Sequence, residues 1–191
     1  MPLAVPVLYG SVRTERQGIR AARFIEGQLR RRGHEATLVD PMERPLPLLD
    51  RTYGDYAGAA PKALEELAEL YRRADGFVIV SGEYNHGIPP ALKNLLDHFL
   101  EEYFWRPSAI VSYSSGAFGG VRAAMQLRMT LGELGMPSVP TILAIPHVGT
   151  AFTEEAAPTG QGLETRAGDF LDEFEWYARA LQAERRRGTP Y

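Results

Sequence analysis

The nine residues Gly10–Gly18 bring hydroxyl, guanidinium and amide side chains together between an apolar run and an amphipathic segment. The apolar run Leu3–Tyr9 predicts a buried strand, and the segment that begins at Ile19 predicts a helix. A tight turn, the Ser11 hydroxyl, the Arg13 guanidinium and the N–H groups of a helix N-terminus together suit a phosphate. The spacing matches neither Gly-x-Gly-x-x-Gly nor the Walker pattern, so a terminal phosphate dianion is expected. A polar loop with a capping serine is the alternative.

A second polar cluster, Glu83-Tyr84-Asn85, follows the apolar run Gly76–Ser81 and is flanked by glycines at positions 82 and 87. An acid, an aromatic ring and an amide suit the edge of a planar heterocycle. The backbone N–H and C=O groups of such a turn can meet the donor and acceptor edge of a flavin ring. Glycine and asparagine are also ordinary turn residues, so a purely structural turn is the alternative.

A third polar segment, rich in serine and glycine, lies between the apolar run Ser108–Tyr113 and a predicted helix that opens at Val121. Glycines at a helix start let the backbone approach a ligand closely, and the exposed N–H groups favour negative charge. A reduced flavin carries such charge at N1 and O2. A glycine-rich turn that only closes the fold is the alternative. The residues concerned are Ser115, Gly116, Gly119 and Gly120.

The elements that must position these loops alternate along the chain. Strands are predicted at 3–9, 36–40, 76–81, 108–113 and 139–145, and helices at 19–32, 61–73, 89–99, 121–134 and 165–184. This alternation predicts an α/β fold with a parallel sheet covered on both faces, in one domain over residues 1–191. Ligands of such sheets bind beyond the carboxyl ends of the strands, where all three polar loops fall. The long loop at 41–60 is also expected to be functional.

The amino-acid composition excludes several classes of function. The formal net charge of -3 shows no basic excess, so no nucleic-acid partner is expected. There is no cysteine, which excludes disulfides, thiolate metal sites and a redox-active thiol pair, so any redox chemistry needs a bound cofactor. The four histidines lack metal-ligand spacing, and no Gly-x-Ser-x-Gly elbow exists, so neither a metal site nor a hydrolase is expected. No secretory signal or membrane-length apolar run is evident, so we expect a soluble cytoplasmic protein.

These motifs together resemble a known family. Gly10-Ser11-x-Arg13, Glu83-Tyr84-Asn85 with Ile88-Pro89-x-x-Leu92-Lys93-Asn94-x-x-Asp97, and the glycines at 116, 119 and 120 resemble the NADPH-dependent FMN reductases. That family is flavodoxin-like and includes azo-, quinone- and chromate-reducing members. The resemblance spans about residues 3–145 and implies a five-stranded sheet in the order 2-1-3-4-5. Many members carry serine and asparagine where this chain has Arg16 and Gly18, and proline where it has Gly82.

The resemblance also implies a cofactor site and an activity. Hydride would pass from NADPH, or NADH, through bound FMN to a flavin, quinone, azo compound or chromate. Donor and acceptor would share one flavin face in turn, and no side chain is predicted to act as a catalytic acid or base. The alternative is a non-enzymatic flavin-binding protein or a one-electron flavodoxin-type carrier. The implied FMN contacts are Ser11, Arg13, Gln17 and Gly18 at the phosphate, Glu83, Tyr84 and Asn85 at the isoalloxazine, and Ser115, Gly116, Gly119 and Gly120 at its pyrimidine side.

The predicted helix Ala91–Phe99 and the segment that follows it to Trp105 are rich in leucine and aromatic residues. Such a face beside a site loop predicts a subunit contact, and the resemblance also points to a homodimer or homotetramer. Ordinary core packing of the same residues is the alternative.

Overall fold

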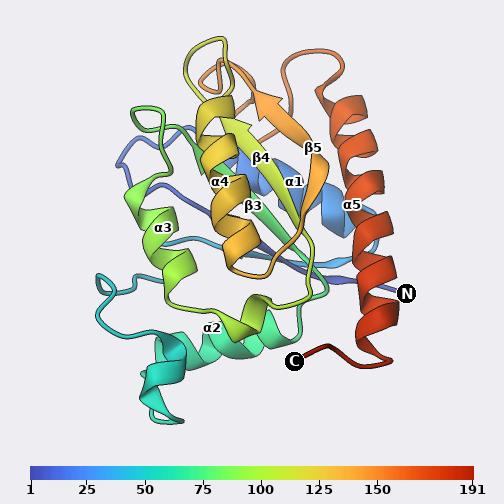
Figure 1. Cartoon of the computed structure of the whole chain (residues 1–191). Coiled ribbons are helices and arrows are strands. Elements are labelled where there is room, and N and C mark those ends of the chain that lie inside the picture. The colour runs from blue at the N-terminus through green and yellow to red at the C-terminus, as the bar shows by residue number, and fades with distance from the viewer.

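Five parallel strands form one sheet in the order β2-β1-β3-β4-β5 in the computed structural model, which describes residues 1–191 (Figure 1). The strands are β1 (Ala4–Tyr9), β2 (Glu35–Val39), β3 (Phe77–Gly82), β4 (Ser108–Tyr113) and β5 (Ser138–Ile145). This is the strand order that the resemblance implied, and the flavodoxin-like architecture is confirmed.

Two layers of helices cover the sheet. The chain runs outward from β1 to β2 and then turns back across the sheet toward β3. Because crossovers between parallel strands are right-handed, the crossover helices before and after this reversal lie on opposite faces of the sheet. As a result α1 and α5 pack on one face, and α2, α3 and α4 pack on the other (Figure 1). The helices are α1 (Ile19–Arg31), α2 (Lys62–Arg72), α3 (Pro90–Asp97), α4 (Val121–Glu133) and α5 (Leu163–Arg185). The reversal leaves a crevice at the carboxyl ends of β1 and β3.

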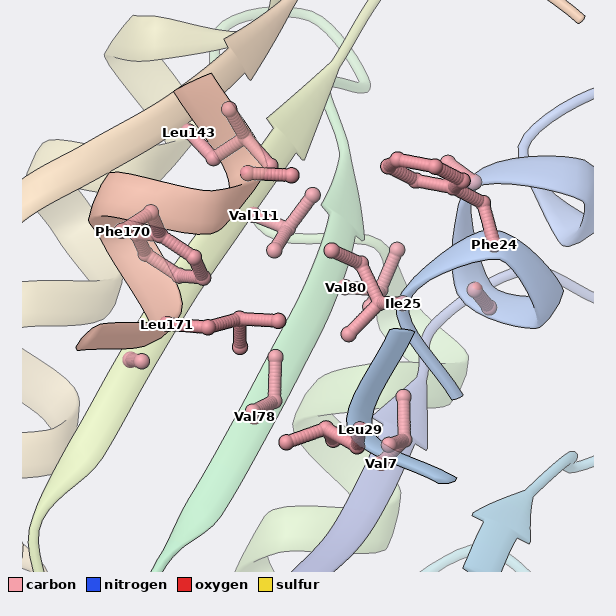
Figure 2. Packing of buried hydrophobic residues seen from close by; sticks show 14 of the residues in the cluster. Val7, Phe24, Ile25, Leu29, Val78, Val80, Val111, Leu143, Phe170 and Leu171 are labelled. Atoms are coloured by element: carbon pink, nitrogen blue, oxygen red, sulfur yellow. The ribbon is translucent and has the colours of Figure 1, made fainter. Parts of the chain in front are cut away.

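The face under α1 and α5 shows why the strands read as continuous apolar runs. Strands buried on both faces have no polar side to alternate with. Figure 2 shows α1 side chains one helical turn apart and α5 side chains converging on valines of the central strands. The labelled residues are Phe24, Ile25, Leu29, Phe170 and Leu171 on the helices and Val7, Val78, Val80, Val111 and Leu143 on the strands.

The opposite face bears on the expected subunit contact. Most apolar side chains of α3 belong to the chain's own core under α2, α3 and α4. Phe104 and Trp105 are half-buried and pack against Tyr191, with ring centroids 5.6 and 4.8 Å away. The core-packing alternative therefore describes the buried side chains of this segment, and they do not form the expected contact surface. The residues that are at most 2% exposed are Leu92, Leu95, Leu96 and Phe99.

Smaller differences concern element boundaries. β2 ends one residue earlier than expected, which leaves Asp40 outside the strand. The predicted long loop contains one 3-10 turn at Tyr53–Tyr56, where the Asp55 carboxylate accepts hydrogen bonds from the N–H and hydroxyl of Thr52, both at 2.8 Å. Such local caps satisfy N–H groups at a helix start that have no helical partner. None of the helices combines the length and apolar character needed to cross a bilayer.

Candidate functional site

A cleft of about 280 Å³ opens at the carboxyl ends of β1, β3 and β4. It lies where the winding of the sheet reverses, as expected for an open parallel sheet. Seven of the predicted site residues line it: Ser11, Arg13, Gln17, Gly18, Glu83, Tyr84 and Ser115. Four predicted residues do not line it: Asn85, Gly116, Gly119 and Gly120. The cleft also includes residues that were not predicted: Glu15, Arg16, Gly82, Tyr113, Ser114 and Val148.

The loop after β1 presents unpaired donors to this cleft. The N–H groups of the six consecutive residues 14–19 form no hydrogen bond within the chain. The Arg13 side chain forms neither an ion pair nor a hydrogen bond, and the residue is exposed. The backbone N–H of Arg13 donates to the Ser11 hydroxyl at 3.4 Å. Free N–H groups at a helix start together with a cation form an anion site.

A buried ion pair fixes this loop. Arg16 donates to both carboxylate oxygens of Asp40 and, at 3.1 Å, to the Ser11 carbonyl. The Asp40 side chain is 0% exposed and that of Arg16 13% exposed, so the pair is shielded from water. Hydrogen bonding to Asp40 raises the pKa of Arg16. The guanidinium also lies 5.4 Å from the centre of the Tyr9 ring. Arg16 therefore positions the loop, and Arg13 is left as the loop's free cation.

Two buried tyrosines form the floor under the loop. The Tyr113 hydroxyl donates to that of Tyr9 at 3.3 Å, and their rings are stacked with centroids 6.3 Å apart. Burial raises the pKa of both phenols, so both stay neutral at physiological pH. A Cβ at Gly18 would lie 2.0 Å from the Tyr113 ring. Glycine is thus required at this position by packing, independently of any ligand.

The turn after β3 lies beside the same loop. The Tyr84 hydroxyl is 2.9 Å from the Ser11 hydroxyl, which ties the two loops together across the cleft. Tyr84 and Gly87 exchange backbone hydrogen bonds of 3.0 and 2.9 Å. The two residues between them have positive φ, 50° at Asn85 and 66° at His86, which is the geometry of a type I′ turn. This turn exposes the Asn85 side chain at its tip, outside the cleft.

The Glu83 carboxylate is engaged within the protein. It accepts hydrogen bonds from the N–H groups of Arg122 and Ala123, at 3.0 and 3.2 Å, at the start of α4. Negative charge at this end of a helix is stabilising. Glu83 therefore caps α4, and the part of it that a ligand in the cleft can use is its backbone.

The loop after β4 is held by the segment after β5, which the sequence motifs did not reach. The carbonyls of Ser114 and Gly116 accept from the N–H groups of Val148 and His147 at 3.0 and 3.1 Å, and the His147 ring contacts the Ser115 carbonyl at 3.2 Å. The N–H groups of Ser115 and Gly116 form no hydrogen bond within the chain. The backbone of this loop thus has its acceptors engaged within the chain and two donors left unpaired.

The glycine pair that ends this loop serves packing. Gly119 and Gly120 have φ of 61° and 77°, and a Cβ at Gly120 would lie 2.6 Å from the Tyr113 carbonyl oxygen. Only glycine allows both this conformation and this close approach to β4. Gly119 and Gly120 therefore fit the alternative given for this segment, a glycine-rich turn that closes the fold.

Comparison with known proteins agrees with this geometry. The sequence profile of a family described as NADPH-dependent FMN reductase matches residues 3–150, so the chain belongs to that family. It is 32% identical to a quinone reductase of Pseudomonas putida over 185 residues, which cover 94% of this chain and 97% of that protein. It is 47% identical to an NAD(P)H-dependent FMN reductase of Schizosaccharomyces pombe over 72 residues, and this match covers 38% of this chain and 35% of that protein.

Among solved structures, the flavoenzyme NAD(P)H:(acceptor) oxidoreductase FerB of Paracoccus denitrificans has the same fold. It superposes with a TM-score of 0.75 at 20% identity, covering 92% of this chain and 98% of that one. The expected family, the fold and the class of FMN-dependent NAD(P)H oxidoreductase are therefore confirmed.

Proposed function

We propose that the whole chain acts as one FMN-binding domain and that the loop after β1 holds the FMN phosphate. The observation that supports this most is the row of unpaired N–H groups at residues 14–19 beside the unpartnered Arg13. Hydrogen bonds to a phosphate dianion are charge-assisted and satisfy several such donors at once. The donor set therefore fits FMN. Ser11, Gln17 and Gly18 complete this end of the cleft.

The other two loops would hold the flavin ring. The backbone of Glu83 and Tyr84 borders one side of the cleft, and Ser115 borders the other. The free N–H groups of Ser115 and Gly116 suit the oxygen- and nitrogen-bearing edge of the ring, where reduction places negative charge. Asn85, Gly119 and Gly120 would contribute to flavin binding by shaping these loops, since none of the three lines the cleft.

Bound FMN would supply the two-electron redox chemistry between the nicotinamide and the acceptor. The protein's residues bind and orient it: the loop after β1 fixes the phosphate, and neutral Tyr9 and Tyr113 form the floor below that loop. NADPH, or NADH, and the acceptor would bind in turn at one exposed face of the flavin. Flavins, quinones, azo compounds and chromate are the proposed acceptors, because stacking on an open face discriminates poorly between rings.

The kinetic test is the initial rate against NADPH at several fixed quinone concentrations. Alternation at one face predicts parallel lines in the double-reciprocal plot. Intersecting lines would mean that donor and acceptor bind together, and the shared face would be refuted. A flavin-loaded protein that oxidises no nicotinamide would instead support a non-enzymatic flavin-binding role. A cytoplasmic location is part of the proposal and is tested by cell fractionation.

We also propose a homodimer or homotetramer, with α4 in the contact in place of α3. An apolar stripe runs from the loop after β4 along the exposed side of α4, and its members are spaced three or four residues apart. Large exposed apolar patches of this kind mark interaction surfaces. Met125→Glu should convert the oligomer to monomer by light scattering, whereas wild-type protein that is monomeric at micromolar concentration would refute the proposal. The stripe consists of Phe118, Val121, Met125 and Met129, which are 65%, 36%, 49% and 72% exposed.

A further inference from the structure

A second cavity, of about 340 Å³, lies between the loop after β2 and the first turns of α3. Its walls are mainly prolines and leucines, which gives it apolar surfaces on several sides. Two polar side chains, Arg44 and Asn94, border it, and Val12 closes it on the side of the loop after β1. The principal apolar residues are Pro41, Pro45, Leu46, Leu48, Pro90 and Leu95.

Hydrogen bonds hold the loop wall of this cavity in place. The Asn94 side chain accepts from the N–H of Leu49 and donates to the carbonyl of Pro47, both at 2.8 Å. A ring nitrogen of His98 contacts the same Pro47 carbonyl at 3.1 Å. At the other end of the loop, Asp40 accepts from the N–H of Met42 at 2.9 Å. The cavity is therefore formed before any ligand enters.

Arg44 is the feature that indicates the ligand. Its backbone N–H donates to the Asp40 carbonyl at 2.9 Å, but the side chain of this half-buried residue forms no ion pair or hydrogen bond. A partly buried cation beside apolar walls is costly unless an anion meets it. The cavity thus combines apolar walls for a flat ring with one unmatched positive charge.

The cavity also adjoins the FMN cleft. Ser11 and Arg13 line the cleft, whereas Val12 between them lines the cavity, so the two hollows flank the same three residues. Pro90, on the cavity wall, closely follows the turn that carries Tyr84. The loop at residues 11–13 therefore separates the two hollows, and a ligand of both would have to span it.

We propose that this cavity binds the adenosine 2′-phosphate half of NADPH, with Arg44 paired to the 2′-phosphate. Adenine is flat with weakly polar faces, and the 2′-phosphate is the one group that distinguishes NADPH from NADH. A neutral quinone offers Arg44 no partner, which is why the nicotinamide donor is the occupant that fits. The proposal rests on the proposed function, because the other half of NADPH must reach the flavin cleft.

Calorimetric titration of the FMN-loaded protein with adenosine 2′,5′-bisphosphate tests the site without any reaction. Arg44→Gln should weaken binding about 10- to 100-fold, the effect of losing one charge-assisted bond. Arg51→Gln removes the same charge from an exposed position on the same loop and should leave binding unchanged. Adenosine 5′-diphosphate, which lacks the 2′-phosphate, should bind more weakly and ignore the Arg44 substitution.

Steady-state rates give the second readout. The ratio of kcat/KM for NADPH to that for NADH should fall about 10- to 100-fold in Arg44→Gln, since the lost bond involves only the 2′-phosphate. Equal binding of the bisphosphate by wild type and Arg44→Gln, with NADPH oxidised normally, would overturn the inference and leave the proposed function intact. If the protein neither retains FMN nor oxidises NADPH but still binds the bisphosphate through Arg44, the proposed function would be refuted and the phosphate site at Arg44 would stand.

Discussion

Replacing Asp40 by asparagine should destabilise the fold and loosen the cofactor loop together. The substitution removes the carboxylate that forms the ion pair with Arg16. The Arg16 side chain is 13% exposed and that of Asp40 is 0% exposed. Breaking a buried pair by removing one partner leaves an uncompensated charge and costs about 3–5 kcal/mol. A domain of this size has about 5–15 kcal/mol of stability in total, so the variant should remain folded but be visibly weakened.

Urea unfolding, followed by circular dichroism, measures this loss as a lower midpoint with an unchanged slope. FMN affinity should fall in the same variant, because Arg16 also donates to the Ser11 carbonyl and so holds the loop after β1 in place. Glu66→Gln is the matched control, since it breaks the exposed pair with Lys62 and should change stability by less than about 1 kcal/mol.

A double substitution separates the ion pair from simple burial. Arg16→Met with Asp40→Leu replaces both charges by apolar groups and should recover most of the stability lost in Asp40→Asn, because no unpaired charge remains. FMN affinity should stay low, since the bond to the Ser11 carbonyl is absent. If Asp40→Asn lowers the free energy of unfolding by less than about 1 kcal/mol, the pair does not hold the loop and the reasoning fails.

Three further outcomes are expected. Arg13→Ala should weaken FMN binding about 10- to 100-fold in fluorescence titration without changing stability, whereas the exposed Arg23→Ala should not; equal affinities would move the phosphate elsewhere. Glu83→Ala should lower the free energy of unfolding by about 1–3 kcal/mol through the lost cap of α4, and no loss would mean that the cap contributes nothing. Burial raises the pKa of Tyr71, so the phenol stays neutral in the fold, and the free energy of unfolding falls as the unfolded phenol ionises above about pH 10. Tyr71→Phe, which removes a buried hydroxyl without a partner, should lessen that alkaline loss, and an unchanged pH profile would contradict this.

The sheet and the location of the site were predictable because both depend on local patterns. Apolar runs alternate with amphipathic segments, and polar residues follow three of those runs directly, so their position at the carboxyl edge follows from topology alone. Ser11, Arg13 and Tyr84 were placed at the cleft in this way. The family resemblance added the strand order.

The directions of the side chains were not predictable, because partners far along the chain decide them. Arg16 faces Asp40, 24 residues away, and Glu83 faces the start of α4, 39 residues away at Arg122. The role of Gly18 likewise depends on the Tyr113 ring that lies beneath it. The apolar side of α3 looked like a contact surface only because the sequence does not show which core covers it.

The most direct test of the central claim is the visible spectrum of the purified protein, reconstituted with FMN and titrated anaerobically with NADPH. The account predicts a bound flavin that co-migrates with FMN after heat release, and a flavin absorption band that bleaches with about one equivalent of NADPH. Arg13→Ala, reconstituted in the same way, should retain less of that flavin. Failure to retain FMN, release of FAD alone, or a bound flavin that neither NADPH nor NADH reduces would contradict the account.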